Sequence, residues 1–101
     1  MNKMSFVALF AAFLSPIAVA HYPVMECSLS DTHIDCQTGF SDGSTAPKYK
    51  IELFDYDDNL IAREVTNEYS KARFERPEGE FYLVFDAGHE APVEIDVVEL
   101  Q

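Results

Sequence analysis

Two histidines, His21 and His89, are the residues of this chain whose chemistry best suits metal coordination. If the chain is cut after Ala20, His21 becomes the amino-terminal residue, and its α-amine and imidazole Nδ1 can close a chelate ring on one metal ion. The unperturbed pKa of an α-amine is about 7.7–8.0, so this amine can lose its proton near neutral pH. Pro23 has no backbone N–H, so the metal cannot continue along successive deprotonated amides.

His89 would supply a second imidazole. It follows Gly88 in the turn-like stretch 86–92, where side chains point into solvent and sites are often built. The His21 amine and the two imidazoles would suit a copper, nickel or zinc ion, because nitrogen donors bind these metals well. The site requires the amino terminus to lie beside this loop. The competing interpretation is a frayed terminus and an exposed loop histidine without a ligand.

The cysteine pair, Cys27 and Cys36, predicts a disulfide in a β-hairpin. If the two cysteines face each other across antiparallel strands, Leu29 faces Ile34 and Asp31-Thr32 is a two-residue turn. The same register places both cysteines and both aliphatic residues on one face, as a buried face requires. A metal site with two thiolates is the rival interpretation, but the pair lacks Cys-x-x-Cys spacing.

Other candidate ligands fit a structural role better. Hairpin parity places Met25 on the buried face and His33 on the polar face. Asp55-x-Asp57-x-Asn59 resembles the start of a calcium loop, but Leu60 stands where that motif needs glycine, so an acidic turn is the better interpretation. No histidine is predicted to be buried beside a nucleophile, so we do not expect an enzyme.

Residues 1–20 have the three parts of a secretory signal. Lys3 supplies the positive charge, 6–14 is an unbroken apolar run, and Ala18-Val19-Ala20 is a small-x-small cleavage site. An uncleaved anchor is the alternative, but the run is shorter than the roughly 20 residues that span a bilayer. We therefore expect a signal peptide over 1–20, one domain over 21–101, and a periplasmic or secreted protein without stable membrane insertion.

The net charge of residues 21–101 limits the classes of partner that we expect. All 18 acidic residues follow residue 20, and six of the seven basic residues do, so the mature net charge would be −12. An acidic body is repelled by nucleic acid and by anionic membrane surfaces, and both are excluded as expected partners.

Strand-like alternation of apolar and polar residues predicts the fold. Two hairpin strands flank the Asp31-Thr32 turn, and further strands are expected at Tyr49–Leu53, Leu60–Thr66, Arg73–Arg76, Phe81–Phe85 and Val93–Val97. Arg73–Arg76 is short and has the character of an edge strand. About seven short strands at regular spacing predict an all-β fold, a single small Greek-key β-sandwich.

One stretch of the chain resembles a known family. The segments Ile51-Glu52-Leu53-Phe54-Asp55-Tyr56-Asp57-Asp58-Asn59-Leu60-Ile61-Ala62 and Pro77-Glu78-Gly79-Glu80-Phe81-Tyr82-Leu83-Val84-Phe85-Asp86-Ala87-Gly88-His89 are similar to prealbumin-like or carboxypeptidase-regulatory-like sandwiches. The Asp-Ala-Gly-His ending resembles exported domains of the DUF4198 type, and a mature chain that begins with His resembles CopC-type periplasmic copper carriers. The usual Thr-Asp-x-x-Gly turn is here Thr66-Asn67-Glu68-Tyr69-Ser70, and Glu90-Ala91 replaces a second Gly-His pair.

The resemblance implies an accessory role in nickel, cobalt or copper handling. We therefore expect an exported protein that binds a transition-metal ion or assists its uptake, with a membrane metal-transport component or another envelope protein as partner. The alternative is a non-enzymatic interaction module of the cell envelope that binds no metal and docks through its strands and acidic face.

Overall fold

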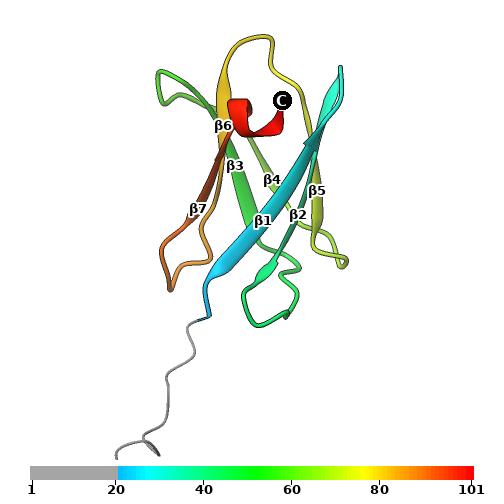
Figure 1. Ribbon diagram of the computed structural model, residues 1–101, viewed down its shortest axis with the longest axis vertical. Helices are drawn as coiled ribbons and strands as arrows, with labels where there is room; N and C mark the ends of the chain where they lie inside the picture. Colours follow the sequence, from blue (N-terminus) through cyan, green and yellow to red (C-terminus); the bar gives the residue numbers. More distant parts are fainter. Residues whose placement is uncertain (1–20) are drawn as a thin grey trace, which may run out of the picture.

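The computed structural model describes residues 21–101, and seven β-strands and one short 3₁₀ turn make up its regular structure (Figure 1). The signal peptide predicted for residues 1–20 lies outside the described residues. The elements are β1 (Pro23–Leu29), β2 (His33–Phe40), β3 (Lys50–Asp55), β4 (Leu60–Val65), β5 (Lys71–Glu75), β6 (Phe81–Phe85), β7 (Val93–Asp96) and the 3₁₀ turn η1 (Val97–Leu100).

The strands form two antiparallel sheets that face each other. One has the order β1-β2-β5 and the other the order β4-β3-β6-β7. The chain crosses between sheets after β2, after β4 and after β5, so strands far apart in sequence become neighbours. In the constant-type immunoglobulin arrangement, the fourth strand lies in the same sheet as the first, second and fifth strands. Here β4 instead pairs with β3 in the other sheet. The predicted all-β sandwich is confirmed, and β5 is an edge strand, as expected.

The first hairpin has the register that the cysteines predicted. Cys27 lies opposite Cys36 and Leu29 opposite Ile34. The backbone N–H of Ser30 donates to the carbonyl of His33 at 2.9 Å and closes the turn. A disulfide joins the two cysteines, and no free cysteine is present in the chain.

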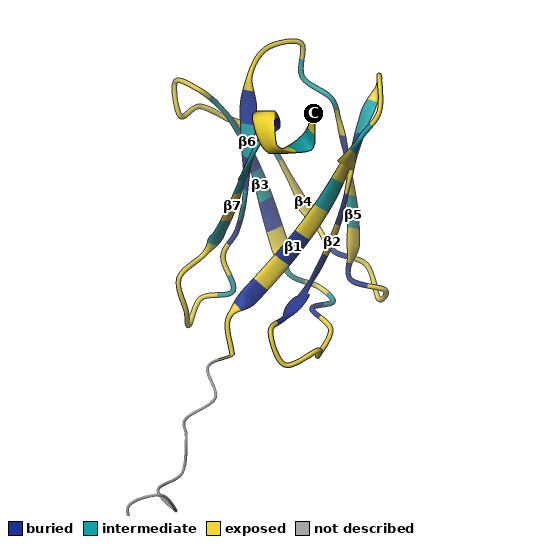
Figure 2. Ribbon diagram, viewed as in Figure 1, coloured by how far each residue is buried: buried dark blue, intermediate teal, exposed yellow. Residues whose placement is uncertain are grey.

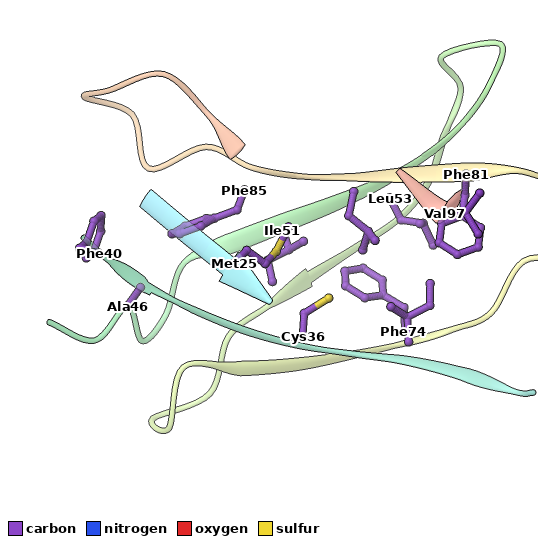
Figure 3. Close-up of a cluster of buried hydrophobic side chains, with 12 residues drawn as sticks. Met25, Cys36, Phe40, Ala46, Ile51, Leu53, Phe74, Phe81, Phe85 and Val97 are labelled. Carbon is purple, nitrogen blue, oxygen red and sulfur yellow. The ribbon is translucent and has the colours of Figure 1, made fainter. Parts of the chain in front are cut away.

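The core lies between the inner faces of the two sheets (Figure 2). Alternate residues of β3 and β6 enter it from the four-stranded sheet, and residues of β1, β2 and β5 enter it from the other (Figure 3). The largest fully buried apolar side chains are Ile34, Ile51, Leu53, Phe81, Leu83 and Phe85. Because alternate strand residues point to opposite faces, this pattern follows from the period-two alternation in the sequence.

The last predicted strand ends one residue early. Val97 is buried but belongs to η1, which begins after Asp96. The Asp96 carboxylate accepts from the N–H of Val98, and the Glu99 side chain accepts from the N–H of Asp96, so the two residues form a capping box. Asp-x-x-Glu is a helix-start signal, and here it turns the chain out of the sheet.

A buried polar network fixes the 41–49 loop to the sandwich. Ser70 Oγ accepts from the N–H of Ala46 at 2.9 Å, and the hydroxyls of Thr38 and Thr66 donate to the carbonyl of Ala46 at 3.1 and 2.7 Å. Thr66 Oγ1 also accepts from the N–H of Tyr49 at 2.9 Å. Within residues 21–101, no buried side-chain polar atom lacks a partner. The loop is therefore a fixed part of the fold.

Candidate functional site

Three segments meet at one end of the sandwich, the lower end in Figure 1. They are the start of β1, the 41–49 loop and the 86–92 loop between β6 and β7. The N–H of Tyr22 donates to Ser41 Oγ at 3.0 Å, and the N–H of Ser41 donates to the carbonyl of Tyr22 at 2.9 Å. These bonds extend the β1–β2 pairing past Pro23 and Phe40, so the backbone next to His21 is held against the loop.

The His21 imidazole contacts a carboxylate of this loop. Its Nε2 atom lies 3.2 Å from Asp42 Oδ2. Ser44 orients Asp42, because its hydroxyl and its N–H donate to Asp42 Oδ1 at 2.7 and 3.0 Å. The two Ser44 hydrogen bonds, with a smaller contribution from the charge of His21, hold the pKa of Asp42 below its usual value. Asp42 is therefore an ionised acceptor for Nε2–H, and Nδ1 of His21 has no partner within residues 21–101.

His89 lies at the same end, in the 86–92 loop. Its ring packs edge-on against Phe40, with ring centroids 5.8 Å apart and planes at 75°. Phe40 in turn contacts the rings of Tyr49 and Phe85. Gly88 has a φ of +92°, a conformation that favours glycine, and its N–H donates to the Asp86 carboxylate. The exposed His89 therefore rests on the edge of the aromatic part of the core.

The two predicted ligands thus flank one short segment, since Phe40 contacts His89 and Asp42 contacts His21. Among residues 21–101, no three side chains of His, Cys, Asp or Glu are grouped as metal ligands. A metal centre built from three or more such side chains is therefore absent from the described part. The donors that remain are two imidazoles and, after cleavage, the His21 amine, a set whose chemistry fits copper, nickel, cobalt or zinc.

The other predicted candidates lie elsewhere. Met25 is 7% exposed and belongs to the core, as parity predicted. His33 begins β2, and its Nδ1 atom lies 2.8 Å from the Thr32 hydroxyl. Asp55 accepts from the N–H groups of Asp57 and Asn59 and from the Asn59 side chain, and the Asn59 bonds chiefly lower the pKa of Asp55. The acidic turn interpretation fits this bonding.

A second feature at the opposite end was not predicted from the sequence. A shallow hollow there is lined by Tyr56, Tyr82, Glu94, Asp96 and Glu99. The Tyr56 hydroxyl donates to Asp96 at 2.5 Å, and the Tyr82 hydroxyl donates to Asp58 at 2.6 Å. The alternation of β6 does place Tyr82 on the outer face, but the partners of both hydroxyls depend on the tertiary structure.

These tyrosines predict a loss of stability at alkaline pH. The hydrogen bond to Asp96 raises the pKa of Tyr56 to about 12, and the bond to Asp58 raises that of Tyr82 to about 12. The pKa is higher in the folded than in the unfolded chain, where it is near 10, so the stabilisation is complete below pH 10 and is lost as the pH rises towards 12. Spectroscopic titration of tyrosinate should show two late-titrating groups, and Tyr56→Phe should remove one. Five tyrosines that titrate together near pH 10 would contradict this prediction.

No protein-family model, curated protein or solved structure matches this chain. The resemblance to prealbumin-like sandwiches and to metal-uptake accessory domains therefore stays a prediction. No helix within residues 21–101 has the length and apolar character needed to cross a membrane. The disulfide fits an exported protein, because such bonds persist in oxidising compartments.

Proposed function

We propose that this chain is a small periplasmic or secreted protein that binds one transition-metal ion, or assists its uptake, through a mature amino terminus at His21. The ligands are the His21 α-amine, His21 Nδ1 and the His89 imidazole. Copper, nickel, cobalt and zinc fit this nitrogen-rich set. A membrane metal-transport component or another envelope protein is the partner that this role implies.

The contact between His21 and Asp42 carries the proposal. A histidine that binds metal through one ring nitrogen commonly donates the other N–H to a carboxylate, which fixes the ring and its tautomer and raises its basicity. Asp42 lies against Nε2, and Ser44 holds Asp42 in place. Nδ1, the nitrogen that closes a chelate ring with the α-amine, is thereby left to the metal.

The structure also supports His89 as the second imidazole. The backbone bonds between Tyr22 and Ser41 hold the start of β1 beside the segment whose Phe40 ring contacts His89. The polar network around Ala46 anchors the far side of the same loop. A metal bound between the two imidazoles would therefore join two segments that the fold already holds at one end.

Metal titration of the mature protein tests the proposal. We expect calorimetry with Cu(II), Ni(II), Co(II) and Zn(II) to give one ion per chain for at least one of these metals. His21→Ala, and a glycine added before His21, should each lower the affinity by at least about tenfold, because each removes the chelate. Asp42→Asn should lower it by about 10–100-fold, the usual effect of losing the carboxylate behind a ligating histidine.

His33→Ala is the matched control, because it removes a histidine from the opposite end of β2 and should leave the affinity unchanged. Intact mass must first establish that the mature chain begins at His21. An affinity that is the same in the wild type, in His21→Ala and in the glycine-extended form would refute the site.

A second candidate function, an envelope interaction module that needs no metal, is favoured by the outer face of the four-stranded sheet. Edge strand β4 exposes Leu60, Ile61 and Val65, which are 45–58% exposed. An exposed edge with apolar side chains offers main-chain and side-chain contacts to another protein.

A further inference from the structure

The hollow at the upper end of the sandwich combines aromatic faces with acidic groups. Tyr82 of β6 stacks on Phe54 of β3, with ring centroids 5.3 Å apart and planes at 16°. Tyr56, in the turn after β3, lines the same hollow and is 45% exposed. Glu94 and Asp96 of β7 and Glu99 of η1 complete the lining. The lining therefore comes from the neighbouring strands β6 and β7, from the turn after β3 and from η1.

The hydrogen-bonding groups of this hollow are almost all acceptors. Both tyrosine hydroxyls already donate their one proton, Tyr56 to Asp96 and Tyr82 to Asp58, so they offer only lone pairs to a ligand. Asp96 uses Oδ1 for its bonds and Glu99 uses Oε2, which leaves one oxygen of each carboxylate without a partner within residues 21–101. A ligand that suits this hollow therefore offers hydrogen-bond donors and has no hydrogen-bond acceptor that must be satisfied there.

The negative charge of the hollow is not neutralised by the fold. No basic side chain lines it. The basic residues of the same sheet face, Lys50 and Arg63, both pair with Glu52. In the described part of the chain, Glu94, Asp96 and Glu99 form no ion pair. Asp58 and Glu80 add to the field, since both contribute to the raised pKa values of the tyrosines.

We propose that this hollow binds an arginine side chain of a protein partner. A guanidinium group has five N–H donors and no acceptor, stacks on aromatic rings, and pairs with carboxylates in its plane. These properties complement the aromatic faces and the unpaired carboxylates of the hollow. A lysine ammonium has the same charge but lacks the planar face, so arginine is the better match.

The surroundings of the hollow favour a protein partner over free arginine. Val98 of η1 is 63% exposed, and Leu60, which faces Phe54 in the β3–β4 register, is 46% exposed. Val98 belongs to η1 and Leu60 follows the turn that carries Tyr56, and a single guanidinium has no apolar group with which to cover these two exposed side chains. The occupant is therefore a basic segment that carries apolar residues beside its arginine. The metal site at the other end contributes no residue, so this inference stands independently of it.

Peptide titration followed by NMR chemical shifts tests the inference on the folded protein. The probes are an acetylated peptide of alternating arginine and leucine, the same peptide with lysine or with neutral citrulline for arginine, and N-acetylarginine amide alone. We expect shift changes at Tyr56, Tyr82 and Glu94, an affinity order of arginine over lysine, and a loss of at least about tenfold with citrulline. Weaker binding of the free amide than of the peptide is also expected.

Two double variants distinguish binding at the hollow from a general attraction of the basic peptide to the negatively charged protein. Glu94→Gln with Glu99→Gln removes two charges from the hollow and should lower the affinity of the arginine peptide about tenfold. Glu26→Gln with Glu75→Gln removes the same charge from exposed positions of the other sheet and should leave it nearly unchanged. Equal losses in both double variants, equal binding of the citrulline peptide, or free amide that binds as tightly as the peptide would overturn the inference.

Discussion

Phe85→Ala is expected to lower the free energy of unfolding by about 3–5 kcal/mol, the range for removing a fully buried phenylalanine. Phe85 is 0% exposed, and its ring contacts both Phe40 and Tyr49. The substitution leaves a cavity and removes two aromatic contacts at once. A domain of this size has a total stability of about 4–12 kcal/mol, so the variant should be close to unfolding at room temperature. Urea denaturation followed by circular dichroism measures the change.

Two further variants bracket this result. Phe85→Leu keeps an apolar side chain in the same place and should lose less stability than Phe85→Ala. Tyr69→Ala removes an aromatic side chain that is 69% exposed and should change stability by no more than about 0.5 kcal/mol. If Phe85→Ala and Tyr69→Ala had similar urea midpoints, the assignment of Phe85 to the core would be wrong.

Replacing both cysteines, Cys27→Ala with Cys36→Ala, should lower the free energy of unfolding by about 2.7 kcal/mol. The disulfide closes a loop between residues separated by 9 positions. In the chain-entropy model, a loop of about ten residues corresponds to roughly 2.7 kcal/mol at 25 °C, because the bond restricts the unfolded chain. The register of β1 and β2 places the cysteines opposite each other, so the hairpin itself should still form.

Reduction provides the internal control for the disulfide prediction. A thiol reductant should lower the urea midpoint of the wild type and leave that of the double variant unchanged. A thiol assay under denaturing, non-reducing conditions should detect no free thiol in the wild type. Two reactive thiols, or a reductant effect of the same size on both proteins, would contradict the assignment.

Local pattern was sufficient for the strands and for the first hairpin. Cys27, Leu29, Ile34 and Cys36 share one face in the register observed, and the alternation in β6 places Phe81, Leu83 and Phe85 inward. Alternation specifies which side chains are buried but not which strands are neighbours. The pairing of β5 with β2, and of β6 with β3, depends on how the sheets close around the core and could not be read from either strand.

Of the residues in the candidate site, only the two histidines could be predicted from the sequence. His21 and His89 stand out by residue type and by their neighbours in sequence. The carboxylate behind His21 comes from a separate loop, and only the fold brings Asp42 to Nε2. Asp42-Gly43-Ser44 is a turn signal in the sequence, but a turn signal does not reveal what the turn contacts. The acceptor-rich hollow was missed for the same reason, because the partners of Tyr56 and Tyr82 lie 40 and 24 positions away.

The order of the strands also determines which contacts can form only late in folding. The hairpins β1–β2 and β3–β4 are local, but Ile34 must meet Phe74 and Leu53 must meet Leu83 before either sheet has its third strand. Until β6 is in place, β3, with Ile51 and Leu53 on its inner face, has only β4 as a neighbour in its own sheet. The sandwich can therefore close only after these long-range pairings have formed, and such non-local pairing makes folding slow compared with a fold built from local contacts.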